Sequence, residues 1–348
     1  MTSKERVRCA VGHKQPDRIP VNFEAMVYVK DKIVREHGLS GHEDIYELYE
    51  VDIRDCSPDY VGPELKRQIE NGRVICETVY GCKMVECQSG GETHSVVCEY
   101  PFNEKTTVQD ILNYDWINPD WFDYESVKCK CARYKDKALQ FGHEGPFQLS
   151  TFLMSMETLF EKMILEPDVA HALYNRFVQF ELEYYERILV AGDGQIDILR
   201  PHDDYGTQQG LLFSVPMWEE YFLENTRKLA ELAHRYGAFY QQHSCGAVRE
   251  IIPSLIKAGA DILEPLQKVK GMEIEKLKHD FGAQICFHGG IDTQFVLPHS
   301  TPEQIEEETR HYIDVLGKGG GYILMASQCF ESDVPVKNID AIYRTARN

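Results

Sequence analysis

The sequence lacks the features of a membrane-bound or secreted chain. No apolar run approaches the ~18 residues that a membrane-spanning helix needs, and the first six residues contain no apolar core of a secretory signal. Low-complexity segments, internal repeats and linkers rich in proline and glycine are also missing. We therefore expect a cytoplasmic protein without a membrane partner, folded as a single domain over residues 1–348.

Positive charge is scarce. The chain has 37 lysines and arginines against 56 aspartates and glutamates, a formal net charge of −19. Nucleic acids and anionic membrane surfaces attract basic patches, so this balance disfavours both as partners. A small molecule or another protein fits the charge better, and a homodimer remains open.

An even set of cysteines at regular spacing is absent too. The 11 cysteines are odd in number and scattered, which disfavours the disulfide framework of a small secreted domain. We expect reduced thiols, some of them available to bind a metal. With 43% hydrophobic residues, the chain can bury a large core without such links.

From the middle onward, short apolar runs alternate with longer amphipathic segments, as is typical of β/α units around a parallel sheet. The predicted strands there are 198–204, 238–243, 261–265, 284–289 and 321–326. The predicted helices are 217–236, 247–258, 272–280 and 302–316, the last capped by Thr301. Three earlier strands at 18–23, 51–55 and 138–142 bring the count to the eight of a (β/α)8 TIM barrel with an N-terminal helical extension.

Residues 72–100 depart from this rhythm. Short β-type runs are broken by Gly81 and by Gly90-Gly91. We predict an antiparallel β-meander inserted in the barrel.

The active site of such a barrel lies at the carboxyl ends of its strands. There, His243-Ser244-Cys245-Gly246 places an imidazole and a thiol two residues apart, and Gly246 lets the chain turn away. Cys329, just beyond the last predicted strand, would stand on the same rim. One imidazole and two thiolates suit Zn²⁺ and leave a position open for a substrate. The alternative is a histidine at the barrel mouth beside two small buried cysteines.

Other polar residues follow the predicted strands. Glu264 is a candidate fourth, displaceable zinc ligand, or a carboxylate that orders the strand end. Arg200, His202, Asp203 and Asp204 form a cluster that could orient a polar substrate or form structural ion pairs. We select His202, Asp204 and His288 as candidate catalytic residues, although a histidine satisfied by backbone bonds is an equal alternative for His288. Gly145-Pro146 predicts a tight turn that points His143 and Glu144 into the mouth.

Several motifs resemble the uroporphyrinogen decarboxylase superfamily. They are Pro16-Asp17-Arg18-Ile19-Pro20-Val21, His243-Ser244-Cys245-Gly246, Ile262-Leu263-Glu264-Pro265-Leu266-Gln267, Gly289-Gly290-Ile291-Asp292 and Gly320-Gly321-Tyr322-Ile323-Leu324. The resemblance runs through nearly the whole chain and implies a (β/α)8 barrel. Its two main branches are the haem-pathway decarboxylases and the zinc-dependent methyltransferases that act with corrinoid proteins, such as the methylcobalamin:coenzyme M methyltransferases.

The first predicted strand separates these branches. Decarboxylases carry arginines there that hold the carboxylates of the substrate, whereas this chain has Asn22, Phe23 and Glu24 and no arginine through Val29. The H-x-C motif with a distant cysteine is similar to the zinc motif of the methyltransferase branch, with His243, Cys245 and Cys329 at its three positions.

The resemblance implies an enzyme that moves a methyl group between a corrinoid and a thiol or other small acceptor. Bound zinc would lower the pKa of such a thiol. The sequence contains no visible corrinoid-binding module, so methylcobalamin is expected on a partner protein that docks at the barrel mouth. The alternatives are an O- or N-demethylase acting from substrate to corrinoid, a decarboxylase of the uroporphyrinogen type, and a non-catalytic tetrapyrrole-binding protein.

Overall fold

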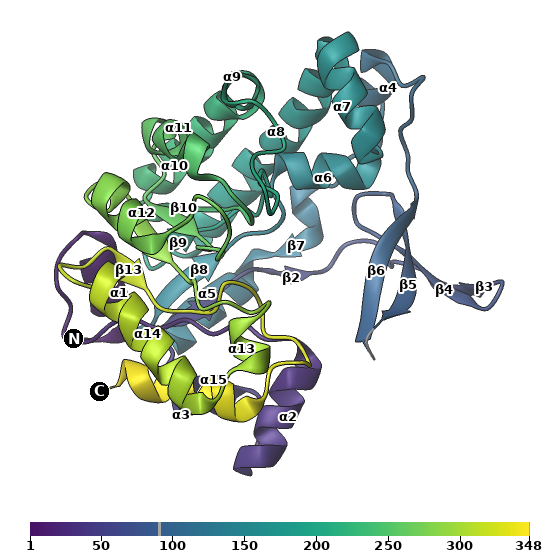
Figure 1. The fold of residues 1–348 in the computed structure, drawn as a ribbon. Coiled ribbons are helices and arrows are strands. Elements are labelled where there is room, and N and C mark those ends of the chain that lie inside the picture. Colours follow the sequence, from purple (N-terminus) through teal and green to yellow (C-terminus); the bar gives the residue numbers. More distant parts are fainter. Residues whose placement is uncertain (90–91, 348) are drawn as a thin grey trace.

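The computed structural model describes residues 1–89 and 92–347, so the predicted turn at Gly90-Gly91 lies outside the described residues. Its centre is a curled sheet of seven parallel strands in the order β1-β8-β9-β10-β11-β12-β13 (Figure 1). The strands are β1 (Ile53–Asp55), β8 (Ala138–Phe141), β9 (Ile198–Leu199), β10 (Phe239–His243), β11 (Ile262–Glu264), β12 (Cys286–His288) and β13 (Tyr322–Ile323). This confirms the predicted α/β fold around a parallel sheet.

The segment predicted as the first strand, residues 18–23, forms an isolated parallel bridge between Val21 and Leu324 instead. Pro20 has no N–H group and cannot donate to a ladder, which limits pairing in this segment. Backbone bonds nevertheless link it to both edges of the sheet. Leu324 N–H donates to the Pro20 carbonyl and Asp52 N–H donates to the Val21 carbonyl, both at 2.9 Å.

Helices follow the strands and surround the sheet (Figure 1). In chain order they are α1 (Ser3–Val11), α2 (Val27–His37), α3 (Glu43–Leu48), α4 (Val108–Leu112), η1 (Pro119–Trp121), α5 (Tyr124–Arg133), α6 (Pro146–Leu153), α7 (Met156–Leu165), α8 (Pro167–Ala191), α9 (Val215–Trp218), η2 (Glu219–Leu223), α10 (Glu224–Arg235), η3 (Arg249–Ile251), α11 (Ile252–Ala258), α12 (Ile274–Phe281), α13 (Val296–His299), α14 (Pro302–Leu316) and α15 (Val336–Ala346). The prediction of α14 is confirmed at both ends, and the hydroxyl of Thr301 caps it by accepting from Gln304 N–H. The predicted helix 217–236 is interrupted by the π-helical turn η2.

Helix α1 closes the amino-terminal end of the barrel. Its Val7 and Val11 join a buried apolar cluster to which six strands each contribute one residue: Ile53, Ala138, Ile198, Ile262, Cys286 and Ile323. Ion pairs fasten the helix, since Arg6 contacts buried Asp52 at 2.6 Å and Lys4 contacts buried Asp197 at 2.8 Å. With this end filled, the opposite end is left to carry the polar residues.

A four-stranded antiparallel sheet lies beside the barrel (Figure 1). It consists of β3 (Arg67–Glu70), β4 (Arg73–Glu77), β5 (Lys83–Ser89) and β6 (Glu92–Glu99), paired in sequence order. It therefore begins before the predicted residue 72. A separate pair joins β2 (Asp59–Tyr60) to β7 (Phe122–Asp123).

Within residues 1–89 and 92–347, no helix combines the length and apolar character needed to cross a bilayer.

A close approach between the segments that follow β8 and β9 makes a prediction about stability. A Cβ atom at Gly142 would overlap the backbone carbonyl of Arg200. Because backbone cannot move aside as a side chain can, Gly142→Ala should destabilise the fold by about 2–3 kcal/mol. Gly41→Ala is the matched control, since a Cβ there meets no atom within 4 Å. Denaturant unfolding of both variants checks this, and equal stability would contradict it.

Candidate active site at the barrel mouth

The carboxyl ends of β9, β10 and β11 bring together three chain segments that are distant in sequence. Asp204 lies five residues after β9, His243 is the last residue of β10, and Glu264 is the last residue of β11. Parallel pairing aligns His243 with Glu264. Gly246, with φ of 87°, turns the chain after Cys245, in a conformation that favours glycine.

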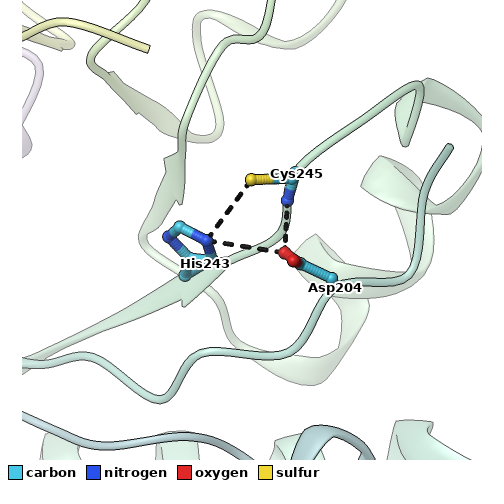
Figure 2. A group of neighbouring side chains, drawn as sticks. All are labelled: Asp204, His243 and Cys245. Atoms are coloured by element: carbon cyan, nitrogen blue, oxygen red, sulfur yellow. Dashed lines mark hydrogen bonds and ion pairs between the residues drawn. The ribbon is translucent and has the colours of Figure 1, made fainter. Parts of the chain in front are cut away.

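Asp204, His243 and Cys245 form a compact group of possible metal ligands, the donor group (Figure 2). Nε2 of His243 lies 3.6 Å from Sγ of Cys245 and 3.5 Å from Oδ1 of Asp204. The same Oδ1 accepts from the backbone N–H of Cys245 at 2.8 Å. Among the residues that the structure describes, only this set of three or more has its donor atoms within 4.8 Å of one another.

Glu264 occupies a different place from the predicted fourth ligand. Its Oε2 lies 2.6 Å from Nδ1 of His243, the ring nitrogen that faces away from Cys245 and Asp204. In this position the carboxylate orients the ring, as carboxylates do behind metal-bound histidines. Burial would lower the pKa of His243, but Glu264, Asp204 and Cys245 together raise it well above its ordinary value.

Arg200 holds Glu264 in place. Its guanidinium bonds Glu264 Oε2 at 2.9 Å through Nε and Glu24 Oε1 at 2.7 Å through Nη1. Burial opposes the charge of Glu264, yet Arg200 and His243 keep its pKa well below the ordinary value. Arg200 is thus a structural ion-pair partner, one of the two roles considered for it.

Cys329 lines a cavity of about 590 Å³, the large cavity, together with Cys245. Both residues line this open space and are only partly buried, which favours the metal-ligand interpretation over that of two buried apolar cysteines. The sulfur of Cys329 is not within 4.8 Å of every member of the donor group. The preceding residue, Gln328, contacts the donor group directly, since its Nε2 donates to Sγ of Cys245 at 3.4 Å.

The second cavity at the mouth, the small cavity, measures about 250 Å³. Asp204 and His243 line it, whereas Cys245 lines the large cavity, and Gln328 lines both. The donor group therefore forms part of the wall between two spaces. His202 also faces the small cavity, and its ring centroid is 4.9 Å from that of His243.

The other predicted residues lie around this centre. Burial lowers the pKa of His202 well below its ordinary value and raises that of Asp203 to about 7. His288 is fully buried below the mouth, with Nδ1 3.0 Å from Oε1 of Gln241 and Nε2 3.4 Å from Asn22. Side chains therefore satisfy its ring, and it does not line either cavity.

The two distances from Nε2 of His243 within the donor group fit a tetrahedral zinc ion. Zinc bond lengths of about 2.0–2.1 Å to nitrogen and about 2.3 Å to sulfur set the two donors about 3.6 Å apart at a tetrahedral angle, and a carboxylate oxygen about 3.4 Å from the nitrogen. The observed separations from Nε2 are 3.6 Å to sulfur and 3.5 Å to oxygen. Imidazole, thiolate and carboxylate are the donor types that zinc accepts.

Sequence reasoning overlooked two features of the site. It selected Asp204 for catalysis, but a carboxylate five residues after a strand end can also reach the strand beside it. It did not single out Gln328, although this residue precedes Cys329 in the same motif. Gly145-Pro146 begins helix α6 rather than a free turn, and only Glu144 of the preceding pair lines a cavity.

A parallel α/β barrel with a histidine-cysteine pair at its mouth is the class of protein that this geometry defines. The family model for uroporphyrinogen decarboxylase (URO-D) matches residues 85–348. The chain belongs to this family. Comparison with curated proteins gave no match.

Comparison with solved structures gave one match that shares the fold of the whole chain and others with lower similarity. A methyltransferase from Methanosarcina mazei superposes with a TM-score of 0.71 at 17% identity, covering 100% of this chain and 98% of that one. A 3-keto-D-glucoside 4-epimerase from E. coli has a TM-score of 0.41 at 11% identity, covering 64% of this chain and 84% of its own. The first likeness establishes the fold over the whole chain.

The contact between Glu264 and His243 predicts the pH behaviour of the metal-free protein. A pKa raised in the folded state means that His243 stabilises the fold fully below its unfolded pKa of about 6.5, and that this contribution is lost as pH rises through the higher folded value. Glu264→Gln should lower the folded pKa. NMR titration of the ring checks this.

The matched control is Glu275→Gln, whose carboxylate contacts His311 instead. It should leave the His243 titration unchanged. A ring of His243 that titrates at or below about 6.5 in the unsubstituted protein would refute the assignment.

Proposed function

We propose that this protein is a zinc-dependent methyltransferase that moves a methyl group between a corrinoid and a thiol or other small acceptor. One observation carries the proposal: the donor group stands in the wall between two cavities. Methyl transfer needs two reactants to meet at one point, and a shared wall lets each approach from its own side.

In the proposed site His243, Cys245 and Cys329 hold the zinc ion, and Asp204 takes the role of displaceable fourth ligand that the sequence suggested for Glu264. The position of Asp204 supports this role, because its Oδ1 lies 3.5 Å from Nε2 of His243. Bound zinc would supply Lewis acidity that makes a coordinated thiol a thiolate at neutral pH. Glu264 and Arg200 contribute by fixing the imidazole ring.

The corrinoid is proposed to arrive on a separate protein. The large cavity supports this arrangement because it is the wider of the two and includes Cys245 and Cys329. A corrin ring is too large for the small cavity of about 250 Å³. The small reactant is therefore assigned to the small cavity and the corrinoid to the large one. Transfer from a methylated substrate to the corrinoid uses the same arrangement in reverse.

The charges at the mouth disfavour decarboxylation of a uroporphyrinogen. A substrate with many carboxylates needs free cationic partners. Arg200 lies at the mouth but is already paired with Glu24 and Glu264. The large cavity adds Glu331 and Asp333 to its lining. Both cavities therefore oppose a polyanionic substrate.

Metal content tests the zinc proposal. Purified protein should contain close to one zinc per chain, and Cys245→Ala and Cys329→Ala should each lose most of it because each removes a thiolate donor. Glu264→Gln should weaken zinc binding about 10- to 100-fold, since it removes the carboxylate behind His243. Elemental analysis and competition with a chelator measure this.

Cys129→Ala is the control, because Cys129 is exposed on α5 away from the mouth. If it lost zinc as Cys245→Ala does, the proposed ligand set would fail. If Cys329→Ala kept its full zinc content while Asp204→Asn lost zinc, the third zinc ligand would be Asp204 and not Cys329.

Methyl transfer is tested with methylcobalamin and a panel of thiols and tetrahydrofolate. Zinc-loaded protein should accelerate loss of the methylcobalamin absorbance with at least one acceptor. His243→Ala should abolish the acceleration, since it removes the only imidazole of the donor group. Tight tetrapyrrole binding without zinc or turnover would instead support the carrier alternative.

A further inference from the structure

The small cavity has a second wall that the zinc proposal does not use. Glu144 lies just before α6, and Gln148 and Phe152 lie on it. These residues are four positions apart, so the two helical side chains share one face of α6 and Glu144 continues the row. All three line the cavity that Asp204 and His243 line.

Several polar side chains that line the small cavity have no bonding partner among the described residues. Among residues 1–89 and 92–347, no group hydrogen bonds or pairs with the Glu144 carboxylate or the Gln148 amide, and none bonds the ring of His202, which lines the same cavity from the segment after β9. Polar groups in a partly buried cavity are usually satisfied by the protein, by water or by a ligand. These three therefore face the space that a small reactant would fill.

Most of the charged side chains that line the small cavity are acidic. Glu24, Glu144 and Asp204 contribute carboxylates, and Arg200 is the single arginine or lysine among its described lining residues. Arg200 is committed to Glu24 and to Glu264 behind it. Asp204 belongs to the donor group. Glu144 is left as the negative charge without a counter-ion in the described chain.

We propose that Glu144 is the counter-ion for a small cationic substrate. The small cavity takes an ammonium-bearing molecule, with its charged nitrogen toward Glu144 and its reacting atom toward the donor group. A substrate carrying a carboxylate or sulfonate is disfavoured, because it would meet the Glu144 carboxylate while the one arginine in the lining is already paired with Glu24 and Glu264. The reaction in this inference rests on the proposed function, whereas the substrate class rests on the residues that line the small cavity.

The first test needs no zinc. Trimethylamine, which is protonated at pH 7, is compared with tert-butanol and trimethylacetate, which have similar shapes with neutral and negative charge. Binding to the full-length protein is measured by saturation-transfer NMR. We expect trimethylammonium to bind most tightly, and Glu144→Gln to weaken it about five- to tenfold because a partly buried charge pair is lost.

Asp333→Asn is the matched control, because it removes the same charge from the large cavity. It should leave trimethylammonium binding unchanged. Equal weakening by the two variants would mean diffuse attraction to an acidic surface and would overturn the assignment. Trimethylacetate binding as tightly as trimethylammonium would also overturn it.

The second test uses zinc-loaded protein and three thiols of one length that end in ammonium, hydroxyl or sulfonate: cysteamine, 2-mercaptoethanol and 2-mercaptoethanesulfonate. Calorimetry should give affinities in that order, and Glu144→Gln should level them. The sulfonate binding most tightly would overturn the inference. If the proposed function fails instead, none of the thiols binds, whereas trimethylammonium still distinguishes Glu144→Gln from Asp333→Asn.

Discussion

The hydrogen bond between Glu264 and Nδ1 of His243 is the constraint on which the mouth of this barrel depends. It commits one ring nitrogen to a buried carboxylate, so Nε2 faces Cys245 and Asp204. Glu264 is held by Arg200, and Arg200 in turn pairs with Glu24, which directly follows the segment 18–23. The orientation of one imidazole is thus set by residues from three separate parts of the chain.

This chain of contacts also explains why the mouth carries little free positive charge. An arginine buried beside a single carboxylate would retain donors for an incoming anion. Here the guanidinium lies between two carboxylates. Arg200 therefore holds the site in shape and is not available to bind an acidic substrate. The remaining carboxylates favour a cationic substrate at the mouth.

The sequence predicted best what is local. The spacing of His243 and Cys245 placed both on one strand end, and the Thr301 cap fixed the start of α14. Strand periodicity found the seven parallel strands, although most proved shorter than predicted. The single-domain assignment for residues 1–348 stays a prediction. The segment 18–23 was wrong as a strand because Pro20 restricts its hydrogen bonding.

The roles of residues that meet only in the fold were harder to predict. Glu264 was recognised as important, but periodicity cannot tell which ring nitrogen a carboxylate will face. Cys329 was placed on the correct rim, while its distance from the donor group depends on the loop that holds Gln328. Asp204 reached the donor group through the backbone of Cys245, a contact without a sequence signal.

The bridging position of Gln328 has a consequence for the order of assembly. It comes from the last β/α unit, yet it contacts Cys245 and borders both cavities. A chain that had folded only through β11 would have the histidine, its carboxylate and one thiol, but would lack the partition between the two spaces. Any ligand that needs both spaces therefore binds only the fully folded chain, and by mass action it stabilises that state over partly folded ones.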